Sequence, residues 1–391
     1  MRDEFDPRST THDPRIMTPY RAPLWLRGGH MQTIYASALM PRPRVAYRRE
    51  RWDTPDGDFI DLDFVEDPSL DGGLGNDNSS PEGSMSATRA PPGVASPAGP
   101  LLRPSTRARH SSLGANAPLV VLFHGLEGSS RSHYARALMA ALGEHGMRGV
   151  VVHFRGCSGE PNRLPRAYHS GDAQEIEWIL RRLRAQNADA PLFAVGVSLG
   201  GNVLLKWQGD CGESAARIVD AAVAISVPLD LMATGNALGQ GFNLVYTRNF
   251  LATLRAMSLA KLARFPGLYD ASAVRASRTL REFDDLVTAP LHGFKDADDY
   301  WTRASSKPGL KHIRVPTLIL NAKNDPFVPA SALPGAGEVS AAVTLEQPDQ
   351  GGHVGFVTGP FPGRSWLPQR VLEFFDAQNQ LQPPIDADER R

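Results

Sequence analysis

The sequence has few cysteines and no excess of charge of either sign. Only two of its 391 residues are cysteines, Cys157 and Cys211. Two cysteines in a chain of this length exclude a disulfide scaffold and favour a reducing compartment. The 42 basic and 42 acidic residues give a formal net charge of zero. No basic excess therefore points to nucleic acid as a partner.

Long hydrophobic runs are also missing. No stretch of 18 apolar residues occurs, so we expect no integral membrane segment. The first 15 residues are polar and lack the apolar centre of a secretory signal. These absences together predict a cytoplasmic protein. The chain also has no metal-ligand cluster, phosphate-binding loop or dinucleotide-binding motif in the required setting, so neither a metal nor another cofactor is expected.

Short apolar runs alternate with amphipathic segments along the chain. Strands are predicted at Arg44–Arg51, Phe59–Val65, Pro118–Phe123, Gly149–Phe154, Leu192–Val197, Ala221–Ser226, Thr317–Leu320 and Val343–Leu345. Helices are predicted at Ser132–Glu144, Asp172–Gln186, Gly201–Trp207 and Trp366–Asp376. Strands that alternate with helices predict an α/β fold, with a mostly parallel central sheet and helices on both faces.

Composition divides the chain into five segments. They are a flexible tail at 1–22, the first part of an α/β core at 23–230, a helical cap at 231–310, the second part of the core at 311–377, and a flexible tail at 378–391. Residues 67–117 interrupt the core with a stretch dominated by Gly, Ser, Pro and Ala. Such a stretch has too few large apolar residues to offset its ordering entropy, so we expect a flexible insertion.

The most informative segment is Gly196–Gly200, which reads Gly-Val-Ser-Leu-Gly. An apolar strand precedes it and a helical pattern follows, which is the setting of a nucleophile elbow. A sharp turn there would project the Ser198 hydroxyl above the sheet edge. The N–H groups after the serine open a helix, so the backbone N–H of Leu199 can face an oxyanion. On this segment alone, a glycine-rich turn with a capping serine, as in a nucleotide-binding fold, is the alternative.

A second oxyanion donor is predicted in the loop after Pro118–Phe123. This loop begins with His124 and Gly125, and glycine at positions 125 and 128 lets it fold back toward the nucleophile. The backbone N–H of Leu126 is the candidate donor. We expect the His124 side chain to pack beneath the loop rather than to act in catalysis.

A serine nucleophile needs a base and an orienting carboxylate, which follow it in the order Asp or Glu, then His. His353 is flanked by glycines just before the last predicted helix, and we predict that it is the base. Asp325 follows the strand Thr317–Leu320 and is the predicted carboxylate. Taken singly, each could be an ordinary loop residue. His292 and His312 are expected on the surface.

Five motifs resemble one family. They are Gly28–Thr33, His124–Ser129, Phe154–Gly159, Tyr168–Asp172 and Gly196–Asn202. Together they resemble the YheT-like hydrolases, the AB hydrolase 4 family, which is related to the ABHD1/2/3-type lipases of animals. The similarity runs from about Pro23 to Phe375, apart from the insertion. It implies the α/β-hydrolase fold and carboxylic-ester hydrolysis by Ser198, Asp325 and His353. Substrates in the wider group are acyl esters of lipids and short-chain esters, and the animal relatives are membrane anchored.

We therefore expect a serine esterase that acts on a small acyl-ester or lipid-like substrate. A thioesterase, amidase or acyltransferase with the same triad is an alternative, and so is a non-catalytic binding module. Apolar side chains in the cap are expected to form an acyl pocket: Phe242, Leu244, Tyr246, Phe250 and Leu254. Gly28–Thr33 could be a lid or an arm docked on the core, and we favour the arm. Arg155 could contact substrate, but a loop-stabilising role is favoured.

Overall fold

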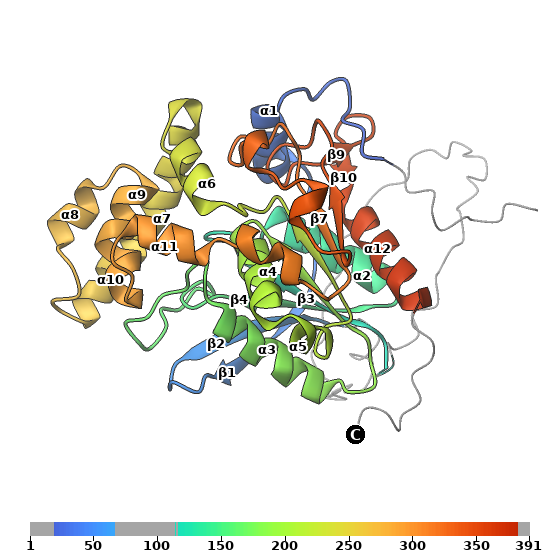
Figure 1. The fold of residues 1–391 in the computed structure, drawn as a ribbon, viewed down its shortest axis with the longest axis horizontal. Helices are drawn as coiled ribbons and strands as arrows, with labels where there is room; N and C mark the ends of the chain where they lie inside the picture. Colours follow the sequence, from blue (N-terminus) through green and yellow to red (C-terminus); the bar gives the residue numbers. More distant parts are fainter. Residues whose placement is uncertain (1–18, 67–113, 115, 382–391) are drawn as a thin grey trace, which may run out of the picture.

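The computed structural model describes residues 19–66, 114 and 116–381. An eight-stranded sheet runs through its centre (Figure 1) in the order β1-β2-β4-β3-β5-β6-β7-β8. The strands are β1 (Tyr47–Asp53), β2 (Phe59–Val65), β3 (Leu119–Phe123), β4 (Arg148–His153), β5 (Leu192–Val197), β6 (Ala221–Ile225), β7 (Thr317–Leu320) and β8 (Val343–Glu346). β2 runs antiparallel to both β1 and β4, and the pairs from β4 to β8 are parallel. This arrangement confirms the predicted sheet.

Helices cover both faces of the sheet. One face carries α2 (His133–Glu144) and α12 (Leu367–Leu381), and the other carries α3 (Ala173–Gln186), α4 (Leu199–Cys211) and the short α5 (Glu213–Ala216). Successive residues of β3 alternate between two cores: Val120 and Leu122 pack with α2 and α12, while Val121 packs with α3 and α4. Strands covered on both sides have no polar face, which explains their continuous apolar sequences.

The segment between β6 and β7 is largely helical, as predicted for 231–310. It contains α6 (Leu231–Leu238), α7 (Leu244–Arg264), α8 (Ala271–Ala276), α9 (Leu280–Phe283), α10 (Ala289–His292), α11 (Ala297–Ala304) and short helical turns, including Asp284–Thr288. These helices lie to one side of the sheet in Figure 1. They therefore stand beyond the edge where the parallel strands end. The exact boundaries of a cap domain stay a prediction.

An arm at the start of the described chain docks on a segment near its end. The arm contains α1 (Gly29–Ile34) and a π-helical turn (Tyr35–Leu39), and it lies beside the small hairpin of β9 (Val357–Thr358) and β10 (Arg364–Ser365) (Figure 1). The Tyr35 hydroxyl donates to the Pro362 carbonyl at 2.8 Å.

The two predicted tails need correction at their inner ends. Tyr20 is buried, and its ring packs against Phe356 and Trp366 at 5.2 Å, so the tail predicted for 1–22 does not reach residue 22. α12 continues to Leu381, past the predicted start of the second tail at 378, because the Ala, Gln and Leu residues there favour helix. Residues 1–18 and 382–391 of the two tails, and residues 67–113 and 115 of the predicted insertion, lie outside the described residues. Within the part described, no helix combines the length and apolarity needed to cross a membrane.

Candidate active site

Ser198 lies at the turn from β5 into α4. Its backbone has φ 52° and ψ −120°, a conformation that residues with a side chain rarely adopt, which matches the sharp turn predicted for a nucleophile elbow. The neighbouring glycines are required by space. A Cβ on Gly196 would lie 2.5 Å from the Cα of Gly201, and one on Gly200 would lie 2.4 Å from the Phe123 carbonyl oxygen. The glycines thus let α4 start directly against the sheet.

Ser198, His353 and Asp325 meet at the carboxyl edge of the sheet, although they come from three separate loops. Nε2 of His353 lies 3.0 Å from Oγ of Ser198, and Nδ1 of His353 lies 2.8 Å from Oδ2 of Asp325. The other carboxylate oxygen of Asp325 accepts the N–H of Phe327 at 2.8 Å. The Phe327 ring packs on the imidazole with 4.2 Å between centroids. The three predicted residues therefore form one continuous hydrogen-bonded chain with a fixed carboxylate.

The loop that carries His353 is held through its backbone. Four consecutive N–H groups each donate to a side-chain oxygen from elsewhere in the chain. The pairs are Gly351 with Gln32 Oε1 at 2.9 Å, Gly352 with Asn324 Oδ1 at 3.0 Å, His353 with Thr33 Oγ1 at 2.8 Å and Val354 with Ser226 Oγ at 2.9 Å. Two of the four acceptors belong to α1, which favours the docked arm over a lid. This network is not predictable from local sequence patterns; its only signal there is the motif at 28–33.

The loop after β3 also borders Ser198. A Cβ on Gly125 would lie 3.1 Å from the Ser198 Cβ, and the Gly125 N–H donates to the Tyr134 hydroxyl at 2.9 Å. Leu126 lines the same cavity as Ser198 and Leu199. Both predicted oxyanion donors therefore belong to residues that line the cavity beside the serine, and their role stays a prediction. The N–H of Leu199, at the first turn of α4, has no acceptor within its own helix.

His124 is buried beneath this loop, as predicted. Its Nδ1 donates to the Gly125 carbonyl at 2.7 Å, and its Nε2 accepts the Phe154 N–H at 3.2 Å. These partners define a neutral imidazole protonated on Nδ1. Burial lowers the pKa of His124 to about 3, which keeps the ring neutral. Its role is therefore to hold the loop.

A cavity of about 160 Å³ opens beside Ser198 and His353. Much of its wall consists of apolar side chains from the segment between β6 and β7: Leu231, Leu238, Phe250, Leu254, Phe283, Val287 and Leu291. Phe250 and Leu254 were predicted here. Phe242 and Leu244 were not correctly predicted, because both are exposed, and Tyr246 instead packs against Phe327. In α7, the side chains that line the cavity recur every three to four residues from Phe250 onward, so they share one face of the helix. The start of α7 does not line the cavity.

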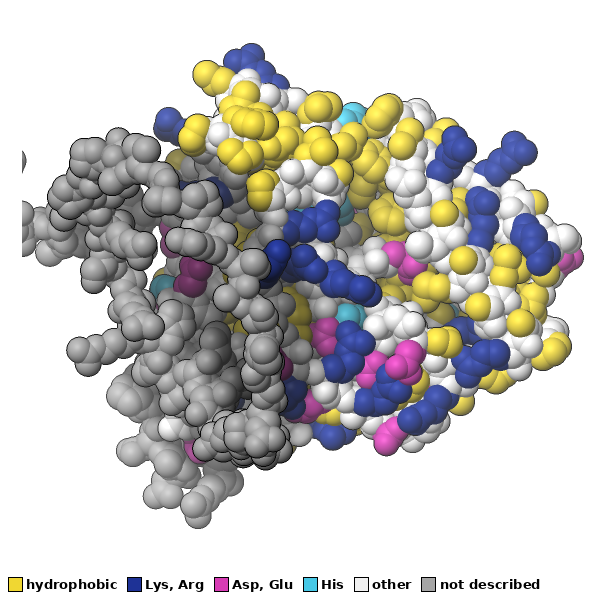
Figure 2. Space-filling view, turned by 180° about the vertical axis from the view of Figure 1, so that it is seen from behind, with side chains coloured by type: hydrophobic (Ala, Val, Ile, Leu, Met, Phe, Trp, Pro, Cys, Tyr) yellow, Lys and Arg dark blue, Asp and Glu magenta, His cyan; other side chains and the backbone are white. Residues whose placement is uncertain are grey.

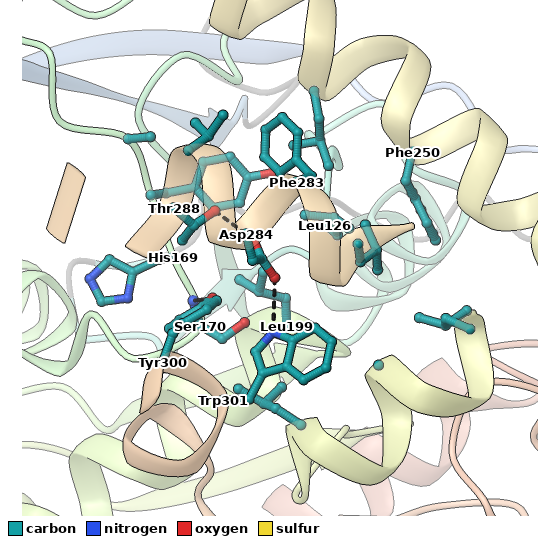
Figure 3. A pocket seen from close by; sticks show the side chains of 18 of the residues that line it. Leu126, His169, Ser170, Leu199, Phe250, Phe283, Asp284, Thr288, Tyr300 and Trp301 are labelled. Atoms are coloured by element: carbon teal, nitrogen blue, oxygen red, sulfur yellow. Dashed lines mark hydrogen bonds between the residues drawn. The ribbon is translucent and has the colours of Figure 1, made fainter. Parts of the chain in front are cut away.

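Polar side chains line another part of the cavity wall (Figure 3). Asp284 accepts from Trp301 Nε1 at 2.8 Å and from Thr288 Oγ1 at 2.6 Å, and burial raises its pKa to about 6. The His169 ring lies on this wall and packs against His292 with 4.3 Å between centroids. The surface position predicted for His292 is therefore wrong: the end of α10 folds onto the loop of His169, and burial lowers the pKa of His292 to about 3. The surface position of His312 is confirmed.

Two further polar side chains connect the segments around the site. Arg155 is buried and pairs with Glu175 at 2.5 Å, Asp58 at 3.0 Å and Asp56 at 2.9 Å, which fits the favoured loop-stabilising role, and it also lines the cavity. Asn202 of α4 is also fully buried. Its Nδ2 donates to the carbonyls of Ser170 and Ala304, and its Oδ1 accepts the Ser306 N–H. Asn202 thus fixes the nucleophile helix to the loops that border the cavity.

Comparison with known proteins shows the family to which the chain belongs. The family described as the alpha/beta hydrolase fold matches residues 118–360, which contain Ser198, Asp325 and His353. The chain belongs to this family. It is 37% identical over 348 residues to YheT of Escherichia coli (strain K12), a protein provisionally named as an esterase, and the match covers 88% of this chain and 89% of that protein.

A second relative is a named phospholipase. The chain is 30% identical over 366 residues to human phospholipase ABHD3, with 93% of this chain and 80% of that protein covered. Among solved structures, an esterase of Pyrococcus furiosus aligns with a TM-score of 0.48 and 15% identity, covering 87% of this chain and 98% of that one. The two sequence relatives confirm the resemblance to YheT-like and ABHD-type proteins. The protein is an esterase- or lipase-like alpha/beta hydrolase.

Proposed function

We propose that this protein hydrolyses carboxylic acyl esters through a covalent acyl-enzyme on Ser198. The observation that carries the proposal is the continuous chain from Asp325 through His353 to Ser198, with 2.8 Å and 3.0 Å between the bonded atoms. A serine hydroxyl is a weak nucleophile until a base accepts its proton, and this geometry provides that base.

The first half of the reaction forms the acyl-enzyme. Oγ of Ser198 attacks the ester carbonyl carbon while its proton moves to Nε2 of His353. Asp325 stabilises the imidazolium through Nδ1–H. The carbonyl oxygen becomes an oxyanion, which the N–H groups of Leu126 and Leu199 stabilise. The carbon–oxygen bond to the alcohol then breaks, and the proton on Nε2 passes to the departing alkoxide.

The second half restores the serine. Water loses a proton to Nε2 of His353 and attacks the acyl carbon. The bond from that carbon to Oγ of Ser198 breaks, the proton returns to the serine, and the free acid leaves. The helical segment 231–310 acts as a cap, and its apolar cavity wall supports an acyl or lipid-like group as the part of the substrate that is held.

The proposal is tested with Ser198→Ala. Wild type should hydrolyse p-nitrophenyl esters and should be labelled by a fluorophosphonate probe, whereas the variant should lose both reactions. A chain-length series of these esters would define the acyl preference. Unchanged turnover and labelling in the variant would overturn the proposal.

The same residues support a second class of reaction. A thioester, an amide, or an alcohol as the final acyl acceptor would use the identical nucleophile, base and oxyanion donors. Parallel assays with acyl-CoA, aryl amides and added alcohols distinguish these reactions from ester hydrolysis. The reaction with the largest kcat/KM identifies the preferred bond and acceptor.

A further inference from the structure

The exposed large hydrophobic side chains are concentrated in one region. Within residues 19–66, 114 and 116–381, all eight of them fall in the segments 24–39 and 242–245 or at residue 361. They are Leu24, Trp25, Met31, Leu39, Phe242, Leu244, Val245 and Phe361. Leu24 and Phe361 are the most exposed, at 80% and 74%. Isolated exposed apolar residues are ordinary, but a set confined to one region marks an interaction site.

The three segments meet in space and form one surface, which we call the apolar face. The Trp25 ring lies 5.5 Å from that of Phe361, and the His30 ring lies 4.7 Å from that of Phe242. Figure 2 shows hydrophobic side chains gathered at the top of the molecule. This is the end where α1, β9 and β10 lie in Figure 1. The arm thus joins residues that are more than 300 positions apart in the chain.

The segments that form the apolar face carry charges of a single sign. Beside α1, where Gln350 contacts Gln32, the exposed Asp349 is paired with Lys323 at 2.8 Å. Residues 19–46, 241–249 and 359–366 contain arginines and no Asp or Glu. The arginines are Arg21, Arg27, Arg42, Arg44, Arg248 and Arg364, and all six are exposed. None of them forms an ion pair with an acidic side chain in the described part of the chain. The chain as a whole is neutral, so this positive border is a local feature.

We propose that the apolar face docks on the surface of a bilayer that contains anionic phospholipids. Exposed Trp, Phe and Leu side chains partition into the boundary between head groups and acyl chains, and arginines around them pair with anionic head groups. A second copy of the chain is a poorer partner. A twofold contact would bring this positive border against itself, which costs electrostatic energy.

The apolar face also lies next to the active site. The Tyr246 hydroxyl is 3.1 Å from His30 Nδ1, and the Tyr246 ring packs against Phe327 at 4.8 Å. Phe327 in turn contacts the imidazole of His353 and lines the cavity. Docking would therefore leave only a few side chains between the cavity and the bilayer. Lipid-like esters are concentrated in that bilayer. The docking surface itself does not depend on the proposed reaction.

Vesicle sedimentation tests this proposal. Wild type is mixed with vesicles of phosphatidylcholine alone and, separately, with vesicles in which about 30% of the lipid is phosphatidylglycerol. The anionic lipid gives these second vesicles a negative surface. Wild type should sediment with the anionic vesicles, bind the neutral ones at least about fivefold more weakly, and be released by raised salt. Leu24→Ser combined with Phe361→Ser should lower anionic-vesicle binding about tenfold or more, because two inserted side chains are lost.

A charge-reversal pair has a matched control. Arg27→Glu with Arg44→Glu should lower binding by more than about 25-fold, since each lost arginine contributes about fivefold. The control variant, Arg217→Glu with Arg314→Glu, has the same change in net charge. Its substitutions lie just before β6 and β7, at the amino ends of the parallel strands, and it should bind like wild type. Thermal unfolding checks that each variant is folded, independently of any ester assay.

Two results would overturn the proposal. One is wild type that stays in the supernatant with both kinds of vesicle. The other is equal loss of binding in the Arg217 and Arg314 control, which would reduce the effect to net charge. Sedimentation velocity without lipid examines the rival partner: a wild-type dimer that the Leu24 and Phe361 variant converts to monomer, together with no vesicle binding, would assign the face to a second copy of the chain.

Discussion

Thr33→Val tests whether the arm positions the proposed base. The Thr33 hydroxyl accepts the His353 N–H at 2.8 Å and donates to the Gly29 carbonyl at 2.8 Å, and the residue is only 6% exposed. Valine has nearly the same shape but neither hydrogen-bonding capacity. The substitution therefore leaves the largely buried N–H of the proposed base without its acceptor.

The expected loss follows from this one bond. A buried donor without an acceptor costs about 1–3 kcal/mol. If the loop moves to avoid that cost, His353 leaves its position beside Ser198, and a loss of that size corresponds to a fall in kcat of about 5- to 150-fold. Three other hydrogen bonds still hold the loop, so we expect a fall in kcat of about tenfold, with a smaller change in KM because the cavity wall is untouched. Thr33→Ser keeps the hydroxyl and should recover most of the activity.

Steady-state hydrolysis of a p-nitrophenyl ester measures this effect. Thr317→Val is the matched control, because it removes a buried threonine hydroxyl that donates to Gln208 at 3.0 Å, far from the site at the start of β7. It should lower the Tm while kcat stays at the wild-type value. In a His353→Ala background, Thr33→Val should have no further effect on the residual rate. If Thr33→Val lowered the rate of the His353→Ala variant by the same factor as it lowers that of wild type, the positioning role would be refuted.

Three other variants test separate parts of the structure. Asp325→Asn should lower kcat by about 10⁴-fold with little change in KM, because the imidazole loses its oriented tautomer; a loss below tenfold would count against the relay. Asp284 has a pKa raised to about 6, so its native state holds a proton that the unfolded state releases, and stability falls as pH rises from about 4 to 6. Chemical denaturation should show Asp284→Asn gaining up to about 3 kcal/mol over wild type between pH 4 and pH 7, and a constant difference would contradict this. Gly200→Ala places a Cβ 2.4 Å from the Phe123 carbonyl and should lower stability by about 1–3 kcal/mol or more in thermal unfolding, whereas Gly143→Ala, with open space around it, should not; equal Tm values would be inconsistent with the close contact.

The parts of the site that the sequence predicts are those with a local signal. Ser198 has a strand before it, a helix after it and glycines at the required spacing, and all of these act within about ten residues. The fold was predicted in the same way, from apolar runs that are buried on both sides. The loops of Asp325 and His353 followed from their order and from their places after a strand and before the last helix.

The remaining features depend on contacts between distant segments. Thr33 and His353 are 320 positions apart, and no periodicity links them. The sequence places His292 in a helical block and so predicts a surface position, but its ring packs against His169, which comes from a distant loop. Phe242 looked like a cavity residue because it is aromatic, but its position on a projecting turn exposes it. Side-chain type alone does not determine which surface a residue faces.

The support of His353 by the arm also affects the order in which the protein can become active. Thr33 is synthesised 320 residues before His353. At roughly 5–20 residues per second, that separation corresponds to about 16–64 s on the ribosome. During that time the loop that bonds to the Thr33 hydroxyl has not been made, and Ser198, once it is made, lacks its proposed base. The last strand of the sheet, β8, ends at Glu346, only a few residues before His353. Ser198, which lies 155 residues before His353, therefore meets its proposed base only when the sheet itself can be completed.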